Sequence, residues 1–223
     1  MSPLGSLPPG GGTTDPTQIS TGQDETNILN GALGAIGAAR VTGIDDGSVN
    51  ANWCKTYYPN LRRTLLQIGT WSFAEDRKQL EAKEEVPLFE FVFKYSLPSD
   101  LLRLKCYNGN LLMPPAVYDL NWWMVYRDWY KIEGQYLLSN DGQVYIVYVK
   151  DIGNPSLWSP LFYQTLEQWL ASKLAAAILK SEALADAKLK AAMGLYLPLA
   201  AVVDAQQQPI HPYVVDDLTW GRY

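Results

Sequence analysis

The spacing of apolar residues changes twice along the chain, and these changes restrict the possible folds more than any other feature. Apolar residues recur every three or four positions from about 24 to 70, alternate along the chain between 88 and 150, and return to the wider spacing after 157. The wider spacing places apolar side chains on one face of a helix, and the alternation places them on one face of a strand. Helices that flank a continuous block of strands predict an α+β fold.

The helical stretches predict a bundle of four main helices. Ser48 is a candidate N-cap of the second helix, because its hydroxyl can accept a hydrogen bond from the first turn. Pro59 lies inside the same helix and is predicted to kink it. A charged stretch at 75–85 is predicted to form a further, solvent-exposed helix. The four main helices are expected at 24–40, 48–70, 157–180 and 182–203.

The alternating stretch predicts an antiparallel β region, inserted at 88–150 between the helices. Its first run carries an aromatic residue at every second position from Phe89 to Tyr95, as expected of a strand with one apolar face. Asp141-Gly142 is the strongest hairpin signal, because this pair favours the tight turns that join adjacent strands. We therefore expect 136–138 and 144–149 to form a hairpin.

Both ends of the chain are predicted to be arms around a single domain at 24–203. Residues 1–23 are rich in Pro, Gly, Ser and Thr, a composition that buries too little apolar surface to fold. This N-terminal arm is expected to be flexible, and it lacks the basic and apolar regions of a signal peptide. Residues 204–223 keep several large apolar residues in a polar context, so they are predicted to form a C-terminal docking arm.

Composition argues against several classes of function. The single histidine, His211, lies in a Pro-containing tail, which disfavours a His-based catalytic triad or a multi-His metal site. The net charge of −5 disfavours a surface that binds DNA phosphates tightly. Cys54 and Cys106 are too few for a disulfide framework, so we expect reduced, buried thiols and synthesis in the cytoplasm. No stretch has the ~18 apolar residues that a membrane span needs, so no membrane partner is expected. No cofactor or metal is expected either.

Two motifs that could suggest chemistry are better explained by structure. Gly31-x-x-Gly34-x-x-Gly37 has the spacing of a nucleotide loop, but no strand precedes it and no Lys-Ser or Lys-Thr follows. We interpret these small residues as a site where another helix approaches closely. Glu81, Glu84 and Glu85, with Asp76 upstream, could form a carboxylate pair for acid–base catalysis. We interpret them as a solvated face, because nothing in the sequence indicates an apolar pocket there.

Two other groups of residues are candidates for contacts. An aromatic cluster between 122 and 130 could be core, could form a subunit interface, or could stack on sugars or unpaired bases. Arg62 and Arg63 are too few for a nucleic-acid site, and we predict that they form an ion pair with the acidic 75–85 stretch of a neighbouring subunit. The cluster consists of Trp122, Trp123, Tyr126, Trp129 and Tyr130.

Six motifs in a fixed order link these segments to a known family. They are Ile28-Leu-Asn-x-Ala-Leu-x-x-Ile-Gly37, Tyr58-Pro59-x-x-Arg62-x-x-Leu65, Trp71-x-Phe73-Ala74-x-x-Arg77-x-x-Leu80, Tyr95-x-Leu97-Pro98-x-Asp100-x-Leu102-Arg103, the stretch from Tyr130-x-Ile132-Glu133-Gly134 to Tyr148-x-x-Asp151, and Asn154-Pro155-x-Leu157-Trp158-x-Pro160-Leu161-Phe162. With these motifs the chain, from about 27 to 204, resembles the adaptor proteins of short-tailed bacteriophages. This group includes the tail tubular protein A type and the head-completion proteins that lie beneath the portal.

The resemblance implies a structural virion protein rather than an enzyme. It implies a ring of roughly twelve copies with cyclic symmetry, bound to the portal protein and to a tail nozzle or tail tube protein, with a tail fibre as a further possible partner. Such a chain is made in the host cytoplasm and ends in the neck of the virion. Double-stranded DNA passes through the ring during packaging and ejection, and an acidic lumen keeps it from binding.

The resemblance and the residues together give three sets of candidate contacts. The C-terminal arm is expected to dock on the portal, the two arginines to close the ring, and the aromatic cluster to face the tail. The portal-docking candidates are Tyr213, Val215, Leu218 and Trp220; the subunit-interface candidates are Arg62, Arg63, Asp76 and Glu81; and the tail-facing candidates are Trp122, Trp123, Tyr126 and Trp129.

Two other functions remain open at this point. A cell-wall-degrading tail component would need two carboxylates that face a cleft. A carbohydrate-binding tail component would need Trp122, Trp123 or Trp129 exposed on a flat face. The C-terminal helices argue against a simple binding module, because such modules are usually all β.

Overall fold

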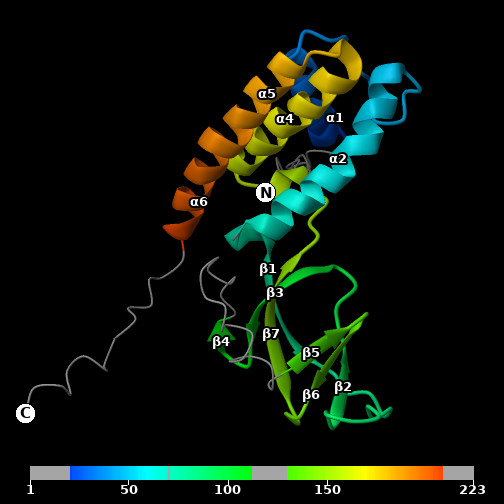
Figure 1. The fold of residues 1–223 in the computed structure, drawn as a ribbon, viewed down its shortest axis with the longest axis vertical. Coiled ribbons are helices and arrows are strands. Elements are labelled where there is room, and N and C mark those ends of the chain that lie inside the picture. Colours follow the sequence, from blue (N-terminus) through cyan, green and yellow to red (C-terminus); the bar gives the residue numbers. More distant parts are fainter. Residues whose placement is uncertain (1–20, 70, 112–129, 208–223) are drawn as a thin grey trace, which may run out of the picture.

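The computed structural model describes residues 21–69, 71–111 and 130–207. Within these ranges the chain has a mixed α+β fold, which confirms the predicted class. Figure 1 shows the helices gathered at one end of the molecule and the strands at the other. The strands lie between α2 and α4 in the sequence, so the chain leaves the helical part once and returns to it once. Residues 122–129 and 213–220, which hold two of the predicted contact sets, lie outside the described residues.

The helices begin where the sequence offers caps. Ser48 caps α2, because its Oγ accepts a hydrogen bond from the Ala51 N–H at 3.1 Å. Ser159 and Ser181 cap α4 and α5 in the same way. Helix α2 continues through Pro59, and the kink expected at this residue stays a prediction. The helices are α1 (Thr21–Gly34), α2 (Val49–Ile68), α4 (Pro160–Leu174), α5 (Glu182–Ala191) and α6 (Leu197–Ala205).

A π-helical turn, Ala192–Tyr196, joins α5 to α6 and makes them one continuous helical rod (Figure 1). Pro198 is the second residue after this turn. A proline has no N–H to donate to the carbonyl four residues earlier, and its ring clashes with that carbonyl in a regular α-helix. A wider turn before the proline relieves this conflict. A second π-helical turn, Ala175–Leu179, ends at Lys180, whose left-handed backbone (φ 52°) stops the α4 helix.

The strands form two small antiparallel sheets. The first has the strand order β1-β7-β3-β4 and the second the order β2-β6-β5. In the first sheet β7 is central and pairs with both β1 and β3. The strands are β1 (Glu75–Leu80), β2 (Phe93–Ser96), β3 (Leu101–Tyr107), β4 (Asn110–Leu111), β5 (Tyr130–Glu133), β6 (Tyr136–Ser139) and β7 (Val144–Lys150).

Three sequence predictions about these elements were wrong. Glu75–Leu80 is a strand and not a helix, because it pairs with β7 along its whole length. Its charged side chains suit an edge strand, where they discourage further pairing. The strand predicted from Phe89 begins only at Phe93, and Phe89 itself is exposed. Pairing with a distant strand therefore overrode the local patterns.

The third wrong prediction is the hairpin at Asp141-Gly142. β6 and β7 are consecutive, but β6 pairs with β2 and β5 whereas β7 pairs with β1 and β3. The connection carries the chain from one sheet to the other. Asp141 holds it there by accepting hydrogen bonds from Tyr107 Oη and Asn108 Nδ2 with its carboxylate, and from Tyr95 Oη with its carbonyl.

Two hydrophobic cores correspond to the two parts of the molecule. The larger core fills the helical part and includes an aromatic group in which Trp71 and Trp158 both contact Phe162 at centroid distances of 5.0 Å. The smaller core lies between the two sheets and includes Tyr95, Leu137 and Ile146. Val149 and Ile152 extend the larger core into the β part. Of the two free thiols, Cys54 is buried and Cys106 is half-buried.

The glycine motif of the first helix is explained by packing in part. A Cβ on Gly31 would lie 2.3 Å from Glu167 Oε2 of α4, so glycine leaves space for that side chain. Gly37 instead adopts φ +75° just after the helix, a conformation that glycine tolerates best. Gly34 has open space around its Cβ position.

Candidate functional site

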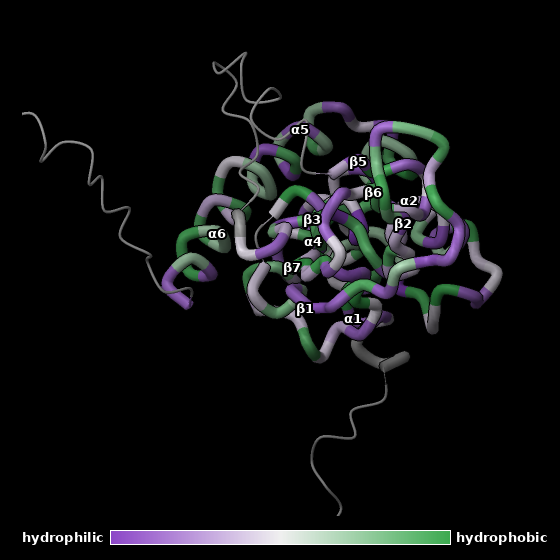
Figure 2. The backbone as a smooth tube through the Cα atoms, turned by 90° about the horizontal axis from the view of Figure 1, so that it is seen from below, coloured by the Kyte–Doolittle hydropathy of each residue, from purple (hydrophilic) through white to green (hydrophobic). Residues whose placement is uncertain are grey.

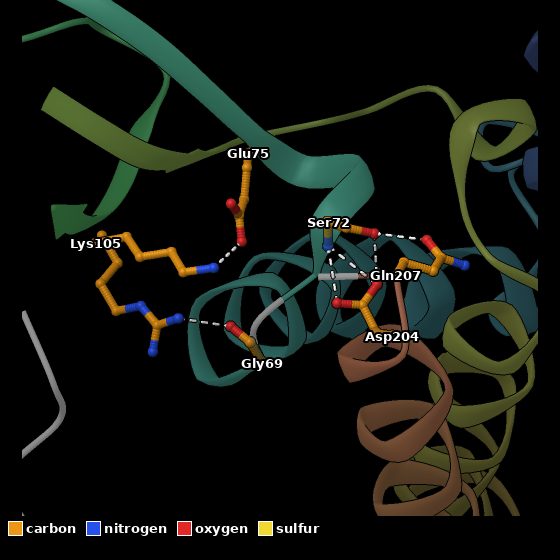
Figure 3. Close-up of polar contacts among 7 residues, drawn as sticks. Gly69, Ser72, Glu75, Lys105, Asp204 and Gln207 are labelled. Carbon is orange, nitrogen blue, oxygen red and sulfur yellow. Dashed lines mark hydrogen bonds and ion pairs between the residues drawn. The ribbon is translucent and has the colours of Figure 1, made fainter. Parts of the chain in front are cut away.

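The junction between the helical part and the β part is held by polar side chains (Figure 3). Asp204 of α6 is only 4% exposed, and it is the only charged residue among the buried residues that the structure describes. Both of its carboxylate oxygens accept from the Ser72 N–H at 3.0 Å, and Oδ1 also lies 2.8 Å from Ser72 Oγ. Gln207 Oε1 lies 2.9 Å from the same hydroxyl. The end of α6 is thereby fixed to the segment that enters β1.

The position of Asp204 moves the start of the predicted C-terminal arm. The arm was expected to begin at residue 204, but α6 runs to Ala205, and Asp204 and Gln207 both contact Ser72. A buried carboxylate without partners would be costly, so Asp204 needs the Ser72 contact to remain buried. Residues 204–207 therefore belong to the folded domain.

A second set of contacts at the junction joins α2 to the first sheet. Arg103 Nη2 of β3 donates to the Gly69 carbonyl at 2.7 Å, and Lys105 of β3 forms an ion pair with Glu75 of β1, on the other side of β7 (Figure 3). Burial lowers the pKa of Arg103, and Glu75 opposes this effect. The Gly69 carbonyl thus receives a charged donor at the end of the helix, where carbonyl groups lack helical partners.

Arg62 and Arg63 also lie at this junction, and both bind Asp151. Arg62 Nη2 is 2.7 Å from Asp151 Oδ1, and Arg63 Nε is 3.2 Å from Oδ2. The Arg62 side chain is 17% exposed and that of Arg63 is 57% exposed. The ion pairs connect α2 to the segment after β7. Pairing of these arginines with a neighbouring subunit stays a prediction, and it would have to compete with Asp151.

The acidic residues expected to face the arginines lie elsewhere. Asp76 of β1 pairs with Lys150 of β7 at 3.2 Å, and hydrogen bonds from the Arg77 N–H and from Lys150 lower its pKa. Glu81 is exposed just after β1, and Glu84 and Glu85 are exposed as well. Glu85 pairs with Lys94 at 2.7 Å. These carboxylates are spread over an exposed loop, as expected of a solvated surface.

Tyr107 connects the two sheets through a buried polar network. Its Oη lies 2.5 Å from Ser139 Oγ and donates to Asp141 Oδ2 at 2.6 Å. Burial, reinforced by the hydrogen bond to Asp141, raises the pKa of Tyr107. A neutral phenol enclosed between two sheets suits a structural role, because it neither ionises near neutral pH nor faces solvent.

Two apolar surfaces remain uncovered by the described residues. The first, the α6 face, consists of Leu195, Leu199, Val202 and Val203 on the outer side of the helical rod. The second, the β-tip loop, consists of Val86, Leu88, Phe89 and Val92 at the free end of the β part. Figure 2 shows the α6 tube coloured mostly as hydrophobic at the edge of the molecule. Apolar patches of this kind mark contact surfaces more often than catalytic sites.

The β-tip loop borders a shallow pocket. Lys94 lies over the Tyr136 ring at 4.2 Å and also forms an ion pair with Glu85. The charges of Lys94 and Glu85 therefore already have partners within the chain. Lys131 pairs with Glu133 at 2.8 Å on the same side. The charged residues that line the pocket are thus held in ion pairs within the chain.

The sequence interpretation missed most of this arrangement. None of the predicted contact sets contains Ser72, Asp151 or Asp204, because their partners are distant in the sequence. The α6 face had a detectable signal: residues 191–203 carry no charge. A helix of a soluble domain normally has a polar outer face, so this run indicated a covered surface.

Within 21–69, 71–111 and 130–207, no cluster of His, Cys, Asp and Glu could hold a metal ion. Among the helices in these ranges, none has both the length and the apolar character to cross a membrane. The chain matches no protein-family model and no curated protein.

Proposed function

We propose that the chain is a head-to-tail adaptor of a short-tailed bacteriophage, a subunit of a ring between the portal and the tail. The observation that carries the proposal is the α6 face, an apolar surface on the helical part that leads directly into residues 208–223. A subunit whose contacts are completed by other chains is expected to expose such a surface. The ordered motifs that resemble the adaptor family support the same function.

The two-part architecture suits a connector. On this proposal the helices form the four-helix bundle of the adaptor family, with the β region inserted between its second and third helices. The α6 face and the segment 208–223 are directed to the portal. The β-tip loop, with Leu88 almost fully exposed, is directed to the tail nozzle or tube. The polar contacts at the junction keep the two ends in a fixed relation.

The charge of the chain suits the passage of DNA. The net charge is −5 per chain, which in a ring of roughly twelve copies gives a strongly negative assembly. A negative surface repels the DNA backbone within about 8–10 Å at physiological ionic strength. DNA can then move through the ring without binding to its wall.

The test is the mass of the chain in solution, measured by light scattering after size exclusion. The chain is measured alone and then mixed with the portal ring of the same phage. We expect a monomer alone and a complex of many copies with the portal. A chain ending at Gln207 should stay folded and fail to join the ring, since it keeps the Asp204 contact but lacks Tyr213, Val215, Leu218 and Trp220.

The outcomes separate the candidate functions. A full-length chain that never binds the portal overturns the adaptor proposal. In that case titration of tryptophan fluorescence with cell-wall glycans tests the carbohydrate-binding alternative. Turnover of peptidoglycan tests the alternative of a cell-wall-degrading tail component. Binding by the shortened chain would leave the adaptor function in place but would refute the docking role of 208–223.

A further inference from the structure

The α6 face is an unusual surface for a free chain. Residues 191–203 contain no charged residue, and four of their large side chains are about half exposed: Leu195 52%, Leu199 48%, Val202 60% and Val203 45%. The opposite side of the same helix is buried through Ala200 and Asp204. Both sides of residues 191–203 are therefore free of charge, although the described residues cover only one of them.

The small size of the face argues against a second copy as its main partner. From Leu195 to Val203 a helix rises only about 12 Å. Stable interfaces between separate chains bury about 800 Å² on each partner. A narrow strip of four side chains cannot supply this area by itself, although it can be part of a larger interface such as the one proposed with the portal. Association of separate chains also costs translational and rotational freedom.

A segment of the same chain does not meet this obstacle. Residues 208–223 follow directly after Gln207, whose Oε1 lies 2.9 Å from Ser72 Oγ. Sixteen residues can span up to about 50 Å when extended, which is enough to return along α6. A tethered segment also binds at an effective concentration in the millimolar range. A small apolar strip is then sufficient to bind the segment.

The composition of this segment matches the α6 face. It carries seven large apolar or aromatic residues, interspersed with Pro, Asp and other polar or small residues. Such a segment presents apolar side chains to a surface and keeps polar ones toward solvent. The seven residues are Ile210, Tyr213, Val214, Val215, Leu218, Trp220 and Tyr223.

We infer that residues 208–223 fold back and cover the α6 face of their own chain. The segment then shields both its own aromatic residues and the α6 face until a partner displaces it. Release uncovers two apolar surfaces at once, next to each other. The inference concerns the isolated chain and holds whether or not the partner is a portal.

Methyl NMR with a paramagnetic label tests the inference on the full-length chain. A nitroxide is attached at Thr219→Cys in a Cys106→Ser background, while Cys54 remains buried. We expect the methyl signals of Val202 and Val203 to be lost through broadening. Val49 is the control, because it is exposed at the start of α2, at the other end of the helical part (Figure 1).

Two further samples make the result decisive. In a Leu195→Ser, Leu199→Ser variant the segment should be released, and the signals of Val202 and Val203 should return. In a mixture, spin-labelled chains without methyl labels are combined with methyl-labelled chains, which should keep their signals. Unbroadened Val202 and Val203 in the first sample overturn the inference. Broadening in the mixture overturns it in favour of contact between two copies.

Discussion

Asp204 and Ser72 are 132 residues apart in sequence, yet the Asp204 carboxylate accepts two hydrogen bonds of 3.0 Å from the Ser72 backbone N–H. This contact ties the end of the helical rod to the entrance of the β part (Figure 3). It also fixes the point from which residues 208–223 start. The relative placement of the helices and the sheets therefore depends in part on this buried carboxylate, together with the Arg103 and Asp151 contacts at the same junction.

Replacement of this carboxylate should reduce stability clearly. Asp204→Ala leaves the Ser72 N–H without its acceptor, and removal of a hydrogen-bond partner with charge costs about 1.5–3 kcal/mol. The free energy of unfolding, measured with urea, gives the size of the effect. Asp186→Ala, at an exposed position of α5, is the control and should change the value by less than about 0.5 kcal/mol. Equal losses in the two variants would show that the Asp204 contact contributes nothing specific.

The ion pairs of Asp151 give a second prediction, in which two arginines differ by burial. Asp151→Ala removes the partner of both arginines, including the largely buried Arg62, and should cost about 1.5–3 kcal/mol. Arg63→Ala removes a mostly exposed partner and should cost less than about 1 kcal/mol. Urea unfolding at low and high salt measures both. A larger loss for Arg63→Ala than for Asp151→Ala would contradict the assignment of Arg62 as the structural partner.

Much of the helical part could be predicted from the sequence. The apolar positions Ile28, Leu29, Ala32 and Leu33 are all fully buried, as their spacing indicated. Ser48 caps α2 as expected. These features depend on neighbours within one or two helical turns, so local patterns contain the information that they require.

The sheets and the junction could not be predicted in the same way. Charged residues at 75–80 favour a helix locally, but pairing of Glu75–Leu80 with β7 satisfies their backbone groups in a strand. Asp141-Gly142 resembles a hairpin turn, but the Asp141 carboxylate is held by Tyr107 of β3. In both cases the deciding contact comes from a residue more than thirty positions away, which periodicity does not report.

Gly69 offers a prediction about close packing at the end of α2. A Cβ at this position would lie 2.2 Å from the Trp71 ring, which is almost fully buried and donates from Nε1 to the Leu65 carbonyl at 2.7 Å. The ring cannot move away without losing that hydrogen bond. Gly69→Ala should therefore destabilise the chain by about 1–3 kcal/mol.

The control for this substitution is Gly43→Ala, where a Cβ would meet no atom within 4 Å. That variant should be neutral or slightly more stable, because alanine reduces the freedom of the unfolded chain. Thermal unfolding followed by near-ultraviolet circular dichroism also reports on the Trp71 environment. If Gly69→Ala matches the control in both stability and spectrum, the Trp71 ring does not lie as close to Gly69 as described.

The half-buried carboxyl of Glu167 predicts how stability depends on pH. Burial raises the pKa of Glu167, while Lys188 acts in the opposite direction. The side chain lies over Gly31 of α1, which explains its desolvation. A carboxyl with a higher pKa in the folded state than in the unfolded state binds its proton more tightly when folded. Glu167 therefore lowers stability as the pH rises from its ordinary value of 4.5 through the raised value, and its ionised form is a cost at neutral pH.

Glu167→Gln should remove this cost, because the amide keeps the shape of the side chain without the charge. The variant is expected to be more stable than the natural chain near pH 7.5, and the difference should shrink as the pH falls toward about 4. Glu84→Gln, at an exposed position, should show no such trend. The measurement is the free energy of unfolding in urea at both pH values. A gain of the same size at both would mean that the charge of Glu167 is not the cause. A loss near pH 7.5 would mean that the attraction between Glu167 and Lys188 outweighs the desolvation of the carboxylate.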